Sequence, residues 1–206
     1  MPKIVDHDAR RAELAEAVWR LASTEGLEAV TLRAVAAQAG WSTGALVHYF
    51  ADKEALLLFA FKLVAERVGR RVAAAAEREP DPLELVRRTL TEGLPLDAER
   101  RTETRLWFSF LGLALTRPAL AKAQRLAYRA WRARVAQLLR EAQRAGRLDP
   151  ELDSEREAAA LVALVDGLAV QATFEPRTLS GPRQQALLDE RLARLQGSGA
   201  ERGSPA

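Results

Sequence analysis

The sequence predicts an all-α protein, and three observations support this prediction. Apolar residues recur with the 3.6-residue period of a helix along most of the 206-residue chain. No segment shows the alternation of apolar and polar residues, bounded by turn residues, that is typical of a strand. Gly and Pro residues divide the chain into segments of helix length. We therefore expect about nine helices, arranged as an N-terminal three-helix domain and a larger helical bundle.

The first helix and the short helices that follow it have clear boundaries. Leu14, Val18 and Leu21 lie on one face of the first helix, which is expected to end before Gly26, because Gly suits the left-handed position after a helix. This helix supplies the apolar face on which the rest of the N-terminal domain can pack.

Two short helices joined by a tight turn come next. Thr31 can cap a helix over residues 32–39, Gly40 permits the turn, and Ser42 or Thr43 can cap a second short helix that runs to about Phe50. Two helices of roughly two turns, joined by about three residues, have the proportions of a helix-turn-helix.

The remaining chain predicts one long helix and five further helices. Asp52 is an N-cap for a long helix that links the two domains and ends before Pro80. The further helices are expected over residues 83–93, 97–116, 118–145, 154–174 and 182–195. We expect the domains to span residues 1–51 and 52–195, and the Gly- and Ser-rich residues 196–206 to be disordered.

Composition excludes several kinds of site. The chain has no Cys and only two His, His7 and His48, which excludes disulfides and Cys-ligated zinc and leaves too few ligands for a His-rich metal site. We expect no metal and no cofactor. No run approaches the ~20 apolar residues of a membrane span, and the start of the chain lacks the apolar segment of a signal peptide. We therefore expect a cytoplasmic protein with no membrane partner.

Net charge does not by itself indicate DNA binding. Residues 1–54 carry six Lys or Arg and eight Asp or Glu, whereas residues 117–147 carry nine Lys or Arg and a single acid, Glu141. The case for an N-terminal domain that reads DNA must therefore come from individual residues.

Residues 31–57 read TLRAVAAQAGWSTGALVHYFADKEALL. They resemble the tetracycline-repressor (TetR) family in three consecutive features: the TxxxxAxxAGxS turn, the GxLxHYF recognition helix and the xxKexLL entry to the linking helix. The GALVHYF wording, the MPK opening and the VDGL of residues 165–168 resemble the choline-responsive, BetI-like branch. This resemblance implies a repressor with a sensing and dimerisation domain, which binds a palindromic double-stranded DNA operator as a homodimer and responds to a small-molecule effector.

The residues of this motif have the chemistry that DNA recognition needs. Short side chains such as Thr43 and Gly44 let a recognition helix approach base edges, while Leu46 and Phe50 form its buried face. The resemblance implies backbone contacts from Thr31, Ser42, His48, Tyr49 and Lys53. It implies an approach to bases by Arg33, Thr43, Gly44 and Val47.

Three of these assignments have simpler alternatives. Thr31 and Ser42 can act only as helix caps, and Tyr49 can be a core residue. Trp41 replaces the small aliphatic residue that is common in the family's turn, and we favour its packing over the domain core rather than its exposure toward DNA.

Aromatic residues concentrate between Thr104 and Trp131 in a chain with only 6% aromatics. We expect the effector to be bound by Thr104, Trp107, Phe108, Phe110, Tyr128 and Trp131, with simple core packing as the alternative. An aromatic cage suits a quaternary cation, whereas the Arg-rich helix over residues 118–145 favours an anionic or neutral ligand. The sequence leaves both open.

The helix over residues 154–174 has an unusually wide apolar face, which suits burial on two sides. The resemblance implies that the last two long helices form a four-helix dimer interface. The expected contacts are Leu161, Val165, Leu168, Leu188 and Leu192. The alternative is that both are ordinary core helices of a monomer.

Two other functions are alternatives to a ligand-responsive repressor. An enzyme has no support, because the chain contains no GxSxG, HExxH, P-loop or GxGxxG motif, and Asp166 is a single acid in an apolar helix. A sequence-tolerant architectural DNA-binding protein, which uses the basic helix and has no small-molecule inducer, is the alternative. It predicts a steep salt dependence without a preferred operator.

Overall fold

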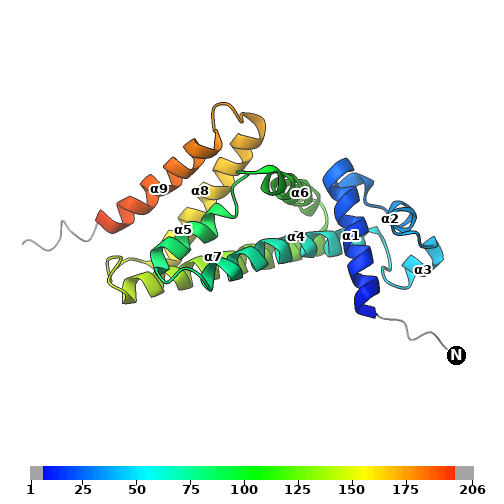
Figure 1. Ribbon diagram of the computed structural model, residues 1–206, viewed down its shortest axis with the longest axis horizontal. Helices are drawn as coiled ribbons and strands as arrows, with labels where there is room; N and C mark the ends of the chain where they lie inside the picture. The colour runs from blue at the N-terminus through cyan, green and yellow to red at the C-terminus, as the bar shows by residue number, and fades with distance from the viewer. Residues whose placement is uncertain (1–6, 198–206) are drawn as a thin grey trace, which may run out of the picture. The chain divides into compact units, whose positions relative to one another are not determined.

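The computed structural model describes residues 7–197, and Figure 1 shows that they fold into helices. Nine α-helices, one 3-10 turn and no strand occur among these described residues, so the all-α prediction is confirmed. The chain forms two compact units. The first comprises the residues up to Arg67 together with Arg105–Gln124, and the second comprises Val68–Thr104 together with the residues from Arg125 onward.

Three helices contribute residues to both units: α4 (Lys53–Ala76), α6 (Ala98–Ala114) and α7 (Pro118–Arg144). The boundary near Asp52 that the sequence predicts divides a DNA-binding domain from a sensing domain. It does not coincide with the division into compact units, and it stays a prediction. The long linking helix that the sequence predicts corresponds to α4, which begins directly after Asp52 and ends at Ala76.

The N-terminal helices of the first unit pack on one another. Helix α1 (His7–Glu25) contacts both the 3-10 turn (Leu27–Ala29) and α2 (Leu32–Ala39), and α2 contacts α3 (Thr43–Val47) (Figure 1). The predicted apolar face of α1 is buried, with Leu14 and Val18 only 1% exposed. Gly26 has a φ of 85°, a conformation that other residues adopt reluctantly, and this ends α1 where the sequence predicts.

The remaining core of the first unit is built around an aromatic side chain of α4. Phe61 stacks on Phe110 with ring centroids 3.9 Å apart and on Trp107 at 5.2 Å. The guanidinium of Arg67 lies 4.1 Å from the ring centroid of Trp19, which joins α4 to α1 through a cation–π contact.

The second unit is held together by a continuous apolar core. Helices α5 (Pro82–Thr91), α8 (Ser154–Phe174) and α9 (Gly181–Gly197) contact one another. Side chains from these helices and from the second part of α7 form the core, including Val86, Leu90, Leu138, Leu139, Leu161, Val165 and Leu188. Helix α8 is long and apolar enough to match a membrane span by length and composition, but its inward face belongs to this core.

Most predicted helix boundaries agree with the structure to within about two residues, as the fraying of helix ends allows. Helix α3 is shorter than predicted, because it ends at Val47 rather than near Phe50. The reason is a tighter last turn, in which the backbone N–H of Tyr49 donates to the carbonyl of Leu46, three residues earlier, at 2.9 Å. Helix α9 continues through Gly197. The MPK opening and the predicted disordered residues 198–206 lie outside the described residues.

Candidate functional site

The turn between α2 and α3 is fixed by two side-chain caps and one glycine. The hydroxyl of Thr31 accepts a hydrogen bond from the backbone N–H of Ala34, and the hydroxyl of Ser42 accepts one from Ala45, both at 3.1 Å. Between them Gly40 adopts a left-handed conformation with φ 70°. Thr31 and Ser42 therefore both act as caps, which holds α3 in a defined orientation on α2.

Helix α3 presents one buried and one open face. Leu46 is fully buried and Phe50 is 8% exposed, whereas the side chain of Val47 is half exposed. A Cβ atom added at Gly44 would meet nothing within 4 Å. The other predicted contact residues that are exposed are Arg33, Ser42, Thr43 and His48. The open face of α3 thus consists of short or apolar side chains that do not hinder the approach of a second molecule.

Lys53 lies at the first residue of α4 and has an intramolecular partner. Its ammonium lies 3.6 Å from the carboxylate of Glu28 and 3.4 Å from the backbone carbonyl of the same residue. Asp52 caps α4 by accepting a hydrogen bond from the backbone N–H of Ala55 at 2.8 Å. An incoming anion would therefore have to compete with Glu28 for Lys53.

Trp41 packs within the domain, as favoured from the sequence, and it contacts two elements. Its indole Nε1 donates to the carboxylate of Glu13 on α1 at 3.2 Å, and its ring lies edge to face with Tyr49 at a centroid distance of 5.4 Å. The guanidinium of Arg10 lies over the same ring at 5.3 Å. Tyr49 is partly buried by this packing.

Comparison with known proteins identifies this arrangement. Residues 14–59 match the family of bacterial regulatory proteins called tetR, and residues 82–197 match the C-terminal part of BetI-type transcriptional repressors. The chain belongs to the TetR family. It is a DNA-binding transcriptional regulator rather than an enzyme, and the resemblance found in the sequence is confirmed.

The similarity of this TetR-family chain to named transcriptional regulators extends over most of each chain. It is 38% identical to the HTH-type transcriptional regulator PksA of Bacillus subtilis (strain 168), over 85% of this chain and 84% of PksA. It is 27% identical to the HTH-type transcriptional regulator BetI 1 of Chromohalobacter salexigens, over 94% of this chain and 96% of the relative.

Solved structures share the TetR-family fold. A transcriptional regulator from Rhodococcus sp. Rha1 is 30% identical in sequence and superposes with a TM-score of 0.77. The superposition covers 91% of this chain and 96% of the Rhodococcus chain. A regulator from Saccharomonospora viridis, solved in complex with choline, is 24% identical with a TM-score of 0.80, covering 91% and 97% of the two chains. At that identity the second structure supports the fold alone.

The six residues predicted to bind the effector do not all belong to one unit. Trp107, Phe108 and Phe110 lie in the first unit of this TetR-family chain, whereas Thr104, Tyr128 and Trp131 lie in the second. Phe110 is fully buried and Thr104 is 8% exposed, so both are enclosed by the chain itself. Trp107 and Phe108 are partly exposed and remain accessible to a ligand.

Trp131 is closely packed on its own unit. A Cβ atom added at Gly93 would lie 2.9 Å from Cη2 of Trp131 and 2.6 Å from Cγ1 of Val165. The outer edge of the indole therefore fills the space that Gly93 leaves open, which makes this edge part of the core.

Two polar residues that the sequence reading did not assign now stand out. Gln124, on α7, is 5% exposed, and neither its amide nitrogen nor its amide oxygen has a hydrogen-bond partner among residues 7–197. Asp166, on α8, is partly buried, which raises the pKa of its carboxyl, while a hydrogen bond from Tyr128 opposes that rise. Asp166 stands out in the sequence as a single acid in an apolar helix, whereas no local signal marks Gln124, which lies between Lys122 and Arg125.

The five residues predicted to form the dimer interface are buried within a single chain. Leu161, Val165 and Leu188 are fully buried, Leu192 is 5% exposed and Leu168 is 6% exposed. Their side chains pack on the core of the second unit, and their contact with a second copy stays a prediction. The large apolar side chains that α8 exposes to solvent are Val170, 36% exposed, and Phe174, 81% exposed.

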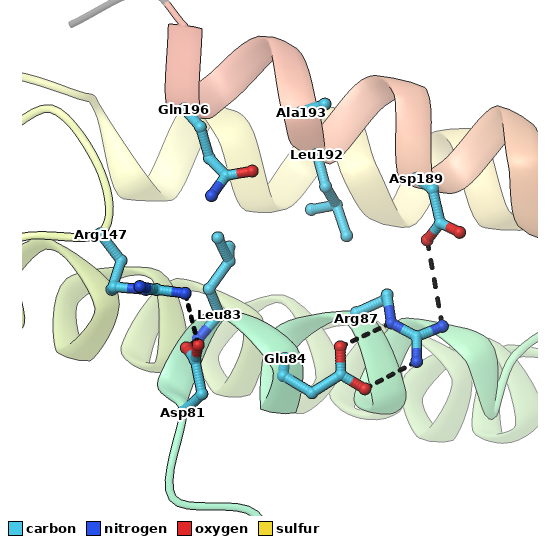
Figure 2. Close-up of a pocket in the computed structure, with 9 residues that line it drawn as sticks. All are labelled: Asp81, Leu83, Glu84, Arg87, Arg147, Asp189, Leu192, Ala193 and Gln196. Carbon is cyan, nitrogen blue, oxygen red and sulfur yellow. Dashed lines mark hydrogen bonds and ion pairs between the residues drawn. The ribbon is translucent and has the colours of Figure 1, made fainter.

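A surface cleft of about 280 Å³ lies in the second unit, between the start of α5 and the C-terminal part of α9 (Figure 2). Arg147 pairs with Asp81 at 2.6 Å, and Arg87 pairs with Glu84 at 2.6 Å and reaches Asp189 at 4.0 Å. Hydrogen bonding to Arg87 lowers the pKa of Glu84. Both cations that line the cleft are already neutralised, and none of its lining residues was predicted to bind the effector, so we assign it no ligand.

Proposed function

We propose that this chain is a cytoplasmic, ligand-responsive repressor that binds a palindromic operator as a homodimer. The observation that carries the proposal is the open face of α3, which two caps hold in place and which presents Thr43, Gly44 and Val47 without obstruction. A helix with short N-terminal side chains and a buried opposite face is what major-groove reading requires.

The proposed contacts fall into two groups. Thr43, Gly44 and Val47 on α3, together with Arg33 on α2, approach base edges, with the half-exposed Val47 placed to meet a thymine methyl. Phosphate contacts come from Thr31, Ser42, His48, Tyr49 and Lys53. Capping does not exclude a phosphate contact, because a hydroxyl that accepts one hydrogen bond can still donate another.

We place the dimer contact on the outward face of α8 and α9. Val170 and Phe174 are four residues apart on α8, so they lie on the same side of the helix. Exposed large apolar side chains of this kind mark surfaces that bind another protein. A two-fold symmetric dimer would set the two recognition helices about 34 to 36 Å apart, one turn of DNA.

We propose that the effector binds the first unit beside Trp107, Phe108 and Gln124. A buried amide with both polar atoms unpaired is unfavourable by about 1 to 3 kcal/mol for each group, which a ligand that supplies a donor and an acceptor would offset. Asp166 in the second unit, which accepts a hydrogen bond from Tyr128, offers a carboxylate to a cationic group instead. Choline is a suitable first compound, because it carries both a hydroxyl and a quaternary ammonium.

The effector acts on DNA binding through α4. This helix begins beside the helix-turn-helix and contributes residues to both units. A displacement of one end of a continuous helix moves the other end. The ligand can shift the equilibrium only by its differential affinity for the two arrangements, so the operator-bound dimer must bind it more weakly.

Selection of genomic fragments by the purified protein, followed by footprinting at near-physiological salt, tests the proposal. A repressor selects one palindrome and protects two half-sites symmetrically. Uniform binding to all fragments with a steep salt dependence would instead support the architectural alternative, in which the exposed basic residues of α7 such as Lys122, Arg125 and Arg129 hold DNA without reading it.

A further inference from the structure

We propose that Arg10 on α1 binds the phosphate backbone of the operator beside Tyr49, and that Trp41 is the positioning residue that holds Arg10 next to Tyr49. The proposal rests on the proposed operator binding and adds to it a site outside the helix-turn-helix motif. The ligand is a DNA phosphodiester, whose oxygens accept hydrogen bonds from a guanidinium and a phenol.

Trp41 connects α1 to the end of the recognition helix. Its backbone N–H donates to the carbonyl of Ala36 at 2.8 Å, which fixes the start of the side chain on α2. Its indole Nε1 donates to Glu13 on α1 at 3.2 Å, which fixes the rotation of the ring. Because the backbone and the ring are both held, the indole forms a rigid platform between α1 and α3.

Arg10 and Tyr49 both rest on this platform. The Arg10 guanidinium lies over the ring at 5.3 Å, and the Tyr49 ring meets it edge to face at 5.4 Å. Arg10 is exposed and makes no ion pair in the described part of the chain, so its N–H groups are available to a ligand. The cation–π contact reduces the freedom of a long side chain without occupying those donors.

The platform also lies directly beside the recognition helix. Trp41 precedes Ser42, the N-cap of α3, and Tyr49 follows α3 by two residues. A duplex that places its bases against Thr43 and Gly44 must carry its phosphates along these flanks. The residues up to Glu54 have an excess of acids over bases, so each correctly placed cation matters for retaining a polyanion.

A smaller residue at position 41 would remove this arrangement. It would leave Arg10 without a ring to lie on and Tyr49 without its edge-to-face partner. Trp41 therefore does more than fill space in the turn, because it fixes a cation of α1 next to the helix that reads DNA.

The test measures binding of the full-length protein to the duplex that the parent selects, from about 50 to 200 mM salt. Arg10→Met should lower the slope of log K against log salt by about one per subunit. Arg11→Met is the matched control, because Arg11 is also exposed on α1 and makes no ring contact or ion pair with the residues that the structure describes. It should leave the slope at the parent value.

Trp41 is tested through its effect on Arg10. Trp41→Leu should weaken binding by about two- to five-fold, the range of an exposed cation–π contact. Trp41→Phe, which keeps a ring, should recover part of that loss. Combining Trp41→Leu with Arg10→Met should weaken binding by less than the two single effects multiplied, because Trp41 acts partly through Arg10.

The outcomes separate this inference from the proposed function. If the parent selects no palindrome, the proposed function fails. If the parent binds its palindrome and Arg10→Met matches Arg11→Met in slope and affinity, this inference alone is overturned. Circular dichroism and thermal melting of each variant identify loss of folding, and Arg10→Met, at an exposed position, remains informative even if Trp41→Leu does not fold.

Discussion

The guanidinium of Arg71 on α4 donates two hydrogen bonds to the carboxylate of Glu103 on α6, at 3.0 and 2.5 Å. Its Nε also donates to Glu92, which follows α5, and Arg100 donates to the same carboxylate. Hydrogen bonding to Glu103 raises the pKa of Arg71, so this side chain stays charged. The cluster joins three helices within the second unit through groups that are largely removed from water.

Breaking this cluster should destabilise the second unit. Arg71→Met leaves the carboxylate of Glu103, 5% exposed, without its bidentate partner, and we expect a loss of about 3 kcal/mol in the free energy of unfolding. Denaturant unfolding monitored by circular dichroism measures the change. Arg70→Met, at an exposed position on the same helix, is the control and should change stability by less than about 0.5 kcal/mol. Equal effects of the two variants would contradict a structural role for the cluster.

Gly93 and Gly112 should respond to alanine in opposite directions. At Gly93 a new Cβ would lie 2.6 Å from Val165 and 2.9 Å from Trp131, so the core must shift, and we expect destabilisation by about 1 to 3 kcal/mol. At Gly112, inside α6, a Cβ meets nothing within 4 Å, so alanine should stabilise by up to about 1 kcal/mol. Thermal unfolding of the two variants checks both signs. A neutral Gly93→Ala would show that the packing of Trp131 is loose.

Glu28 should weaken DNA binding by holding Lys53. Glu28→Gln removes the carboxylate that lies 3.6 Å from the ammonium, and we expect about two- to five-fold tighter binding to any duplex. Lys53→Ala should weaken binding to all sequences and lower the salt slope by about one per subunit, whereas Thr43→Val should alter the preference at particular bases. Fluorescence anisotropy titrations measure all three.

Matched variants make this prediction specific. Glu25→Gln removes an exposed acid that has no ion pair among the described residues and should tighten binding less than Glu28→Gln. Lys62→Ala removes an exposed lysine that pairs with Glu66 and should leave the slope unchanged. A Lys53→Ala variant with altered base preference and an intact salt slope would refute our division of phosphate and base contacts.

Asp166 should make the protein less stable as pH rises toward neutrality. Burial raises the pKa of its carboxyl above the ordinary value of 3.8, against the hydrogen bond from Tyr128. The folded state therefore favours the protonated acid, and this contribution to stability is complete below pH 3.8 and is lost as pH rises through the folded-state pKa. Arg132 lies over the ring of the same Tyr128 at 5.8 Å.

The substitution Asp166→Asn tests this pH dependence. Asn stays neutral and can still accept the hydrogen bond, so the variant should be more stable than the parent at pH 7, and the difference should shrink as the solution is acidified. Melting temperatures across this range measure it. A difference that is independent of pH would show that the carboxylate is not penalised by burial.

The outward face of α8 should control association. Phe174→Glu places a charge at a side chain that is 81% exposed, so it should yield folded monomers if this face forms the dimer contact. Leu168→Glu is a poor test of association, because Leu168 is buried in its own unit and a charge there should unfold the unit itself. Analytical ultracentrifugation with circular dichroism separates the two effects. A Phe174→Glu variant that remains dimeric would place the interface elsewhere.

Local signals in the sequence determined most of the helical architecture. Caps such as Thr31 and Ser42, the glycine at position 26 and the prolines between helices act over a few residues, so they can be read without knowing the rest of the fold. The helix-turn-helix motif could also be identified from the sequence, because its residues are contiguous from Thr31 to Leu57. Their chemistry could be assigned position by position.

Only the tertiary structure decided which partner each side chain meets. Periodicity shows that Leu161 and Leu188 lie on apolar faces, but it cannot say whether their own unit or a second chain covers them, and the structure buries both within one chain. The same limit applies to Trp107 and Trp131, which share an aromatic-rich segment but belong to different units. It applies most clearly to Lys53 and Glu28, which are 25 residues apart. Their pairing depends on the position of the start of α4 beside the 3-10 turn. No local sequence pattern predicts the distance between the Lys53 ammonium and Glu28.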